Sequence, residues 1–172
     1  DHFVRPFYLA MEEDEVYKNS RDFCLLNKPR HMIPVEWIEE FFRVYKTRPK
    51  FAFLFQCELS HDNINRVNVA DGDFVGFLTR MKQNGNLDNT IFVMMSDHGA
   101  RFSSVRESIQ GKYEERLPYF GIYLPPTFKE KYLNAYANLK DNLDRLTTPF
   151  DIHETLHDIA GIKGEKFRNL TT

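Results

Sequence analysis

Two short apolar runs, Phe51–Phe55 and Ile91–Met95, constrain the fold of this chain more than any other feature. We interpret both as buried strands because they are short, continuous and bounded by polar clusters. Between them, apolar side chains at positions i, i+3, i+4 and i+7 predict a covering helix over residues 70–83: Phe74, Phe77, Leu78 and Met81. Asn84-Gly85-Asn86 is predicted to end this helix.

The order strand, polar loop, helix, turn, strand, polar loop is that of a βαβ unit, whose two strands are parallel. The carboxyl ends of parallel strands meet at one edge of the sheet, where ligands bind in open α/β folds. The loop with His61 and Asp62 should therefore approach the loop with Asp97 and His98. We predict an α/β fold with a mostly parallel sheet flanked by helices.

The remaining elements are predicted from the spacing of apolar residues and from residues that begin or end helices. A helix should begin near Pro34 and end before Pro49, with an aromatic stripe that we assign to the core. Residues 101–117 are polar and predicted to be irregular, and Tyr119–Leu124 should form a third strand. A second helical stripe covers residues 132–146. Thr148 should cap a last helix that has Pro149 at its first position and stops at Gly161.

Composition narrows the class of partner. The chain has 172 residues, enough for one sizeable core. Its net charge is −2 and it has no basic stripe, so we expect no nucleic-acid partner. The longest apolar runs fall far short of the roughly 18 residues that a membrane span needs, so we expect no span. Cys24, Cys57 and the glycosylation pattern at Asn169 leave the compartment open, and the oligomeric state is equally open.

The first candidate metal site is Asp97-His98, with His61 from the neighbouring loop. A carboxylate and an imidazole suit Zn²⁺, Mn²⁺ or Fe, and a metal there can polarise a phosphoryl or sulfuryl oxygen. The alternative interpretation is structural: Asp97 caps a turn and His98 fills a loop.

The second candidate is His153-Glu154-Thr155-Leu156-His157, a literal His-Glu-x-x-His on a predicted helix. Two histidines at i, i+4 can bind Zn²⁺ with the glutamate as general base, which makes a zinc metalloprotease our third functional hypothesis. Such a site needs a third ligand, and the ligand-type side chains that follow are Asp158 and Glu165. Apolar residues at helical spacing also explain this helix as an ordinary covering element: Ile152, Leu156 and Ile159.

Several blocks of the chain resemble the sulfatase-like branch of the alkaline phosphatase superfamily. More closely, the chain resembles a family of animal proteins, often predicted to be secreted, that is described as a domain of unknown function. The match covers most of residues 50–160, and residues 1–48 form a less well matched lead-in. It rests on Asp73 and on four blocks that follow one another in the order found in the family: residues 59–65, 88–101, 111–118 and 142–156.

The resemblance implies a three-layer α/β sandwich and a role for each matching residue. Asp97 and His98 match the late metal-ligand pair, and His98 stands where many calcium-dependent sulfatases carry Asn, so Zn or Mn is expected rather than Ca. His61, the candidate catalytic residue, matches a region that supplies a substrate-binding or metal-binding histidine elsewhere in the superfamily. Cys57 stands where nucleotide-pyrophosphatase relatives carry Asp, which favours substrate contact over metal ligation for His61. Arg101 and Lys112 are the expected contacts to the anionic group.

The nucleophile and early metal ligand of these enzymes lie upstream of the matching blocks, and residues 1–50 contain no such stretch. We therefore expect residues 1–172 to form one domain, the carboxyl-terminal part of a catalytic domain that resides in the secretory pathway. The leading hypothesis is a fragment of a metal-dependent hydrolase or transferase acting on small phosphate or sulfate esters. In isolation it should hydrolyse little or nothing. The second hypothesis is a non-catalytic secreted binding module of the same fold.

Overall fold

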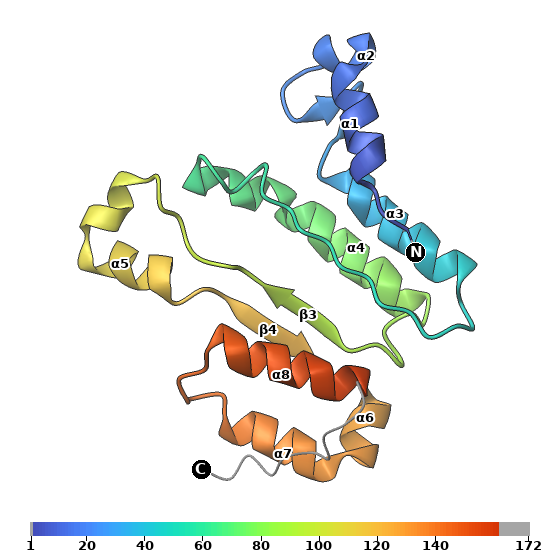
Figure 1. Cartoon of the computed structure of the whole chain (residues 1–172), viewed down its shortest axis with the longest axis vertical. Helices are drawn as coiled ribbons and strands as arrows, with labels where there is room; N and C mark the ends of the chain where they lie inside the picture. Colours follow the sequence, from blue (N-terminus) through green and yellow to red (C-terminus); the bar gives the residue numbers. More distant parts are fainter. Residues whose placement is uncertain (1, 162–172) are drawn as a thin grey trace. The chain divides into compact units, whose positions relative to one another are not determined.

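The structure is a computed structural model that describes residues 2–161 (Figure 1). The chain has an α/β fold in which helices predominate. It divides into two compact units, Asp1–Thr127 and Phe128–Thr172, which we describe separately. The first unit carries all the strands and the Asp97-His98 motif, and the second carries the His153–His157 segment.

The first unit begins with two helices and a small hairpin, and continues with a helical core and a second strand pair. In chain order its elements are α1 (Arg5–Glu13), α2 (Glu15–Lys18), β1 (Cys24–Leu25), β2 (Lys28–Pro29), α3 (Met32–Val44), η1 (Ile64–Ala70), α4 (Asp71–Gln83), β3 (Phe92–Met95), η2 (Ser104–Glu107), α5 (Ile109–Arg116) and β4 (Phe120–Tyr123).

The core of this unit lies between α3 and α4. Both helices were predicted from their apolar spacing and are confirmed, although α3 buries Val35 and Phe42 while Trp37 stays 43% exposed. The core cluster joins residues from both helices and from the segment after α4: Val35, Phe42, Phe77, Met81 and Leu87. The helix α4 ends as predicted, because Asn84 caps it and Gly85 adopts a left-handed backbone with φ 71°.

Strands β3 and β4 confirm two of the three predicted strands. They pair antiparallel, with Phe92 opposite Tyr123 and Met95 opposite Phe120. The prediction that the first of these is fully buried is wrong, because Met94 and Met95 are 40% and 49% exposed. Each strand of a two-stranded sheet has only one neighbouring strand. Its outer edge is therefore unpaired, and much of the sheet surface faces solvent.

The predicted strand at 51–55 is not formed. Phe51, Phe53 and Phe55 are 78%, 74% and 63% exposed, and among the described residues no backbone hydrogen bond joins this segment to another. Of this segment Leu54 packs against the core cluster, as does Phe92 of β3. Within residues 2–161 both sheets are two-stranded and antiparallel, so the predicted mostly parallel sheet is absent there. A strand needs a neighbour for its backbone groups, and apolar content alone does not supply one.

The prediction that residues 101–117 are irregular is also wrong, because η2 and α5 occupy most of this stretch. Both helices are set by local capping. The Ser103 hydroxyl accepts from the Val105 amide at 3.3 Å, and the Ser108 hydroxyl accepts from the Gly111 amide at 3.0 Å. Because these helices bury few apolar side chains, they leave no apolar stripe in the sequence.

The second unit contains most of α6 (Pro126–Lys131), together with α7 (Leu133–Asp141) and α8 (Pro149–Ala160). The stripe at 132–146 predicted a longer helix than α7, which ends at Asp141. The helix α8 is bounded as predicted, with Thr148 at its N-cap and Gly161 in a left-handed conformation at its end. None of the described helices combines the length and apolar character needed to cross a membrane.

The capping box of α8 should make its stability depend on pH. The Thr148 hydroxyl and backbone amide both donate to Oδ2 of Asp151 at 2.7 Å, which holds the pKa of that carboxyl below its usual range. A lowered folded-state pKa stabilises the helix above the unfolded value, about 3.9, and this contribution is lost as pH falls through the folded value. Urea unfolding should therefore show wild type and Asp151→Ala converging as the solution is acidified below about pH 4. A constant difference across that window would contradict the assignment.

Candidate functional site

Asp97 and His98 follow β3 directly and direct one atom each toward a common point. Oδ2 of Asp97 lies 3.5 Å from Nε2 of His98, and the two side chains are 59% and 34% exposed. Nδ1 of His98 lies 2.8 Å from the Gly99 carbonyl, which can only accept, so Nδ1 carries the proton. The lone pair of the neutral ring is therefore on Nε2, the atom that faces the carboxylate.

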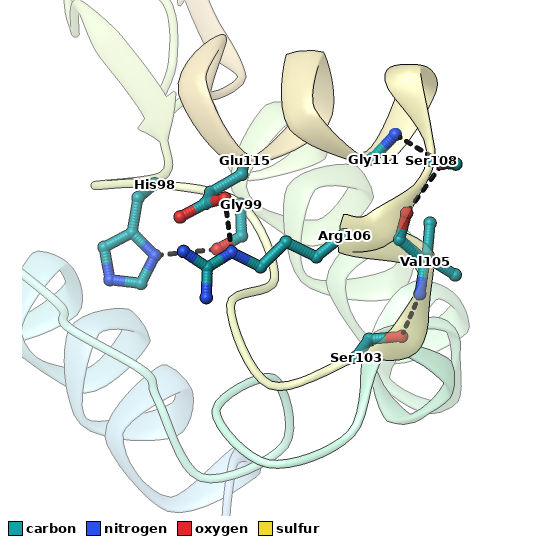
Figure 2. Close-up of polar contacts among 8 residues, drawn as sticks. All are labelled: His98, Gly99, Ser103, Val105, Arg106, Ser108, Gly111 and Glu115. Carbon is teal, nitrogen blue, oxygen red and sulfur yellow. Dashed lines mark hydrogen bonds and ion pairs between the residues drawn. The ribbon is translucent and has the colours of Figure 1, made fainter.

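The same loop is fixed to β4 and to α5 by backbone contacts. The Ser96 amide donates to the Tyr119 carbonyl at 2.9 Å, which extends the strand pairing by one step. The Gly99 amide donates to the Glu115 carbonyl at 3.0 Å (Figure 2). The other Asp97 oxygen, Oδ1, accepts from the His98 amide at 2.9 Å. Oδ1 of Asp97 thus makes a local contact to the loop backbone, and Oδ2 remains available for a ligand.

Arg101 lines a shallow depression that begins two residues after Gly99. The depression has a volume of about 550 Å³, and its lining consists of Arg101, Phe102, Ser103, Ser104, Arg106 and Glu107. Arg106 in this lining forms an ion pair with Glu115 of α5 at 2.9 Å (Figure 2). Two guanidinium groups and two hydroxyls can contact an anionic group there, although Arg106 is paired with Glu115 and Glu107 adds a negative charge to the lining.

His61 approaches this depression from the other polar loop. Its ring packs against Phe102 with 5.2 Å between centroids, and its Nδ1 lies 2.6 Å from Oδ1 of Asp62. The loops after 51–55 and after β3 are thus in contact at His61 and Phe102. The βαβ unit predicted that His61 and Asp62 lie near Asp97 and His98; the contact that the structure shows is with Phe102, and the first strand of that unit is not formed.

The other predicted residues are placed as follows. Lys112 is an exposed residue on α5. His153 and His157 lie on α8 with ring centroids 4.1 Å apart, and Nδ1 of His153 is 3.1 Å from the Glu154 carboxylate. Cys24 is half-buried and Cys57 is exposed, and both are free thiols. Asn169 and Glu165 lie outside the described residues.

Among the contacts that the sequence does not signal are the ion pair of Arg106 with Glu115 and the contact of His31 with Asp73. Arg106 lies in a stretch predicted to be irregular, because the helix that carries Glu115 has no apolar periodicity. His31 is 3% exposed and its Nε2 lies 2.7 Å from Oδ2 of Asp73, which joins the start of α3 to the first turn of α4. Nothing in the spacing of these residues signals either pair, since the partners are brought together by packing.

Comparison with known proteins gives one family. A family model described as "Protein of unknown function (DUF229)" matches residues 1–172. No curated protein and no solved structure gives a significant match. The family match confirms the coarser part of the resemblance, that to a domain of unknown function. Since the model spans the whole sequence, the chain belongs to the DUF229 family.

Proposed function

We propose that the intact protein is a metal-dependent hydrolase or transferase of phosphate or sulfate esters, with Asp97 and His98 among its metal ligands. The observation that carries the proposal is the convergence of Asp97 Oδ2 and His98 Nε2, 3.5 Å apart. Two ligand atoms of a tetrahedral Zn²⁺, each bonded at about 2.1 Å, are separated by roughly 3.4 Å. The pair is therefore spaced to share one ion.

The chemistry of the pair also fits a transition metal. His98 is held by the Gly99 carbonyl in the tautomer that leaves Nε2 unprotonated, which is how second-shell carbonyls prepare a metal-binding imidazole. One nitrogen and one carboxylate oxygen favour Zn²⁺ or Mn²⁺ over Ca²⁺, which prefers oxygen alone. Such an ion, when bound, polarises the phosphoryl or sulfuryl oxygen of the ester.

The residues around the pair supply the contacts that an anionic ester needs. Arg101 and Arg106 place positive charge in one depression, and their guanidinium groups match the planar oxygens of phosphate and sulfate. His61 stacks on Phe102 at the same depression, and with Nδ1 engaged by Asp62 its Nε2 is the atom left to contact the ester. Lys112, exposed on α5, would add a more distant positive charge.

The proposal predicts that Asp97→Ala and His98→Ala each lower the Zn²⁺ or Mn²⁺ affinity of the intact protein by at least about tenfold. Metal content after dialysis, measured by mass spectrometry, and calorimetric titration report this directly. Asp22→Ala is a matched control, because it removes an exposed carboxylate in the turn before β1. Equal metal content in all four proteins would overturn the assignment.

Ester hydrolysis separates the enzyme from the binding module. The intact protein should hydrolyse an aryl phosphate or an aryl sulfate with metal present, and both site variants should lose this turnover. Metal binding at Asp97 and His98 without turnover on either ester would favour the non-catalytic binding module instead.

A further inference from the structure

His153 and His157 form a second arrangement that can bind a metal, separate from the Asp97 loop. They are four residues apart on α8, and their ring centroids lie 4.1 Å apart with 41° between the planes. Both side chains are exposed, and that of His153 keeps 62% of its surface. Imidazoles at i and i+4 project from one helix face, so a single ion can reach both.

Glu154 prepares His153 for this role. Its Oε1 lies 3.1 Å from Nδ1 of His153, and the carboxylate can only accept, so Nδ1 donates. The lone pair of the neutral ring is then on Nε2, at the outer end of the side chain. In this geometry Glu154 orients an imidazole, as carboxylates behind metal-binding histidines do. It is a positioning residue and not a general base.

Capping interactions fix both ends of α8, which limits the conformational entropy lost when His153 and His157 bind one ion. The capping box of Thr148 and Asp151 closes its first turn, and Gly161 ends it in a left-handed conformation. His153 and His157 lie between these ends, so their backbone spacing does not depend on a ligand. Only rotation about the side-chain torsions is needed to bring the two nitrogens onto one ion.

We propose that His153 and His157 chelate a borderline divalent cation, Zn²⁺, Ni²⁺ or Cu²⁺, at the surface of α8. Two imidazoles select these ions over Ca²⁺ and Mg²⁺, which prefer oxygen ligands. Within the described residues no group of three or more His, Cys, Asp and Glu side chains is placed to hold a metal ion. The described part of α8 thus supplies two ligands, and water or a further donor completes the coordination. The site is an accessible, exchangeable binding site that is independent of the Asp97-His98 pair.

The test is a calorimetric titration of the intact protein with Zn²⁺ and, separately, with Ca²⁺. The Asp97→Ala/His98→Ala variant serves as the parent, so that the first site does not contribute. In this background Zn²⁺ should bind at α8, and His153→Ala or His157→Ala should each weaken that binding at least about tenfold, since either change leaves a single imidazole. His2→Ala, an exposed histidine on the other unit, should leave it unchanged. Far-UV circular dichroism should be the same in all variants.

Each outcome decides the proposal. Unchanged Zn²⁺ affinity in His153→Ala and His157→Ala would overturn it, as would Ca²⁺ binding that these substitutions weaken equally. Loss of α8 binding in the Asp97→Ala/His98→Ala parent would overturn the independence of the two sites. Failure of the Asp97-His98 proposal leaves the α8 titration unaffected, because the two assays vary different residues.

Discussion

Alanine at position 99 should destabilise the first unit by about 3 kcal/mol, the upper part of the range for overpacked sites. A Cβ at this position would lie 2.1 Å from the Glu114 carbonyl oxygen and 2.8 Å from Cα of Glu115. Both are backbone atoms of α5, so no side-chain rotation relieves the clash. The loop must move away from the helix, which breaks the hydrogen bond from the Gly99 amide to the Glu115 carbonyl.

Displacement of this loop should also disturb the candidate metal site. The Gly99 carbonyl fixes the tautomer of His98, so Gly99→Ala should lower metal affinity together with stability. Urea unfolding followed by circular dichroism measures the stability, and metal titration of the folded protein measures the second effect. Gly72→Ala is the matched control, because a Cβ there meets no atom within 4 Å. In helix α4 this change should stabilise the protein by about 0.5–1 kcal/mol. Equal unfolding midpoints for the two variants would refute the packing argument.

Phe77→Ala should have the other large effect, a loss of about 3–5 kcal/mol in the free energy of unfolding. Phe77 is 5% exposed and belongs to the cluster that joins α3 to α4. Its removal deletes an aromatic ring from between the helices and leaves a cavity that their backbones cannot fully close.

Val75→Ala is a suitable control for this prediction. Val75 lies two residues earlier on the same helix and is 57% exposed. Its replacement should change stability by no more than about 0.5 kcal/mol. Urea titration of both variants decides the matter, and a Phe77→Ala protein as stable as Val75→Ala would show that the cluster does not hold α3 and α4 together.

The elements that could be predicted from sequence are those whose signal is local. Phe77 and Met81 repeat at helical spacing on α4, and Thr148, Pro149 and Gly161 mark the ends of α8 by well-understood capping chemistry. The position of Asp97 and His98 just beyond the end of β3 could also be predicted, because polar ligand-type residues follow the apolar run Ile91–Met95.

What could not be predicted depends on partners that are distant in sequence. The run 51–55 has the composition of a strand, yet within the described residues it has no neighbouring strand, so its backbone groups remain unpaired. The pairing of β3 with β4 is antiparallel, although a connection as long as that through η2 and α5 would equally allow a parallel crossover. His31 meets Asp73 only because α3 and α4 pack, and neither residue carries a sign of the other.

The open segment at 51–55 has a consequence for the behaviour of the isolated polypeptide in solution. Three exposed phenylalanines lie on a segment whose amides and carbonyls have no backbone partner within residues 2–161, and together they form a template on which a second molecule can add a strand. Positive charges precede this segment at Lys46, Arg48 and Lys50. Repulsion between these charges on neighbouring molecules opposes such association. Because salt screens that repulsion, raised ionic strength should favour association of the chain, and dilute, low-salt buffers should keep it dispersed.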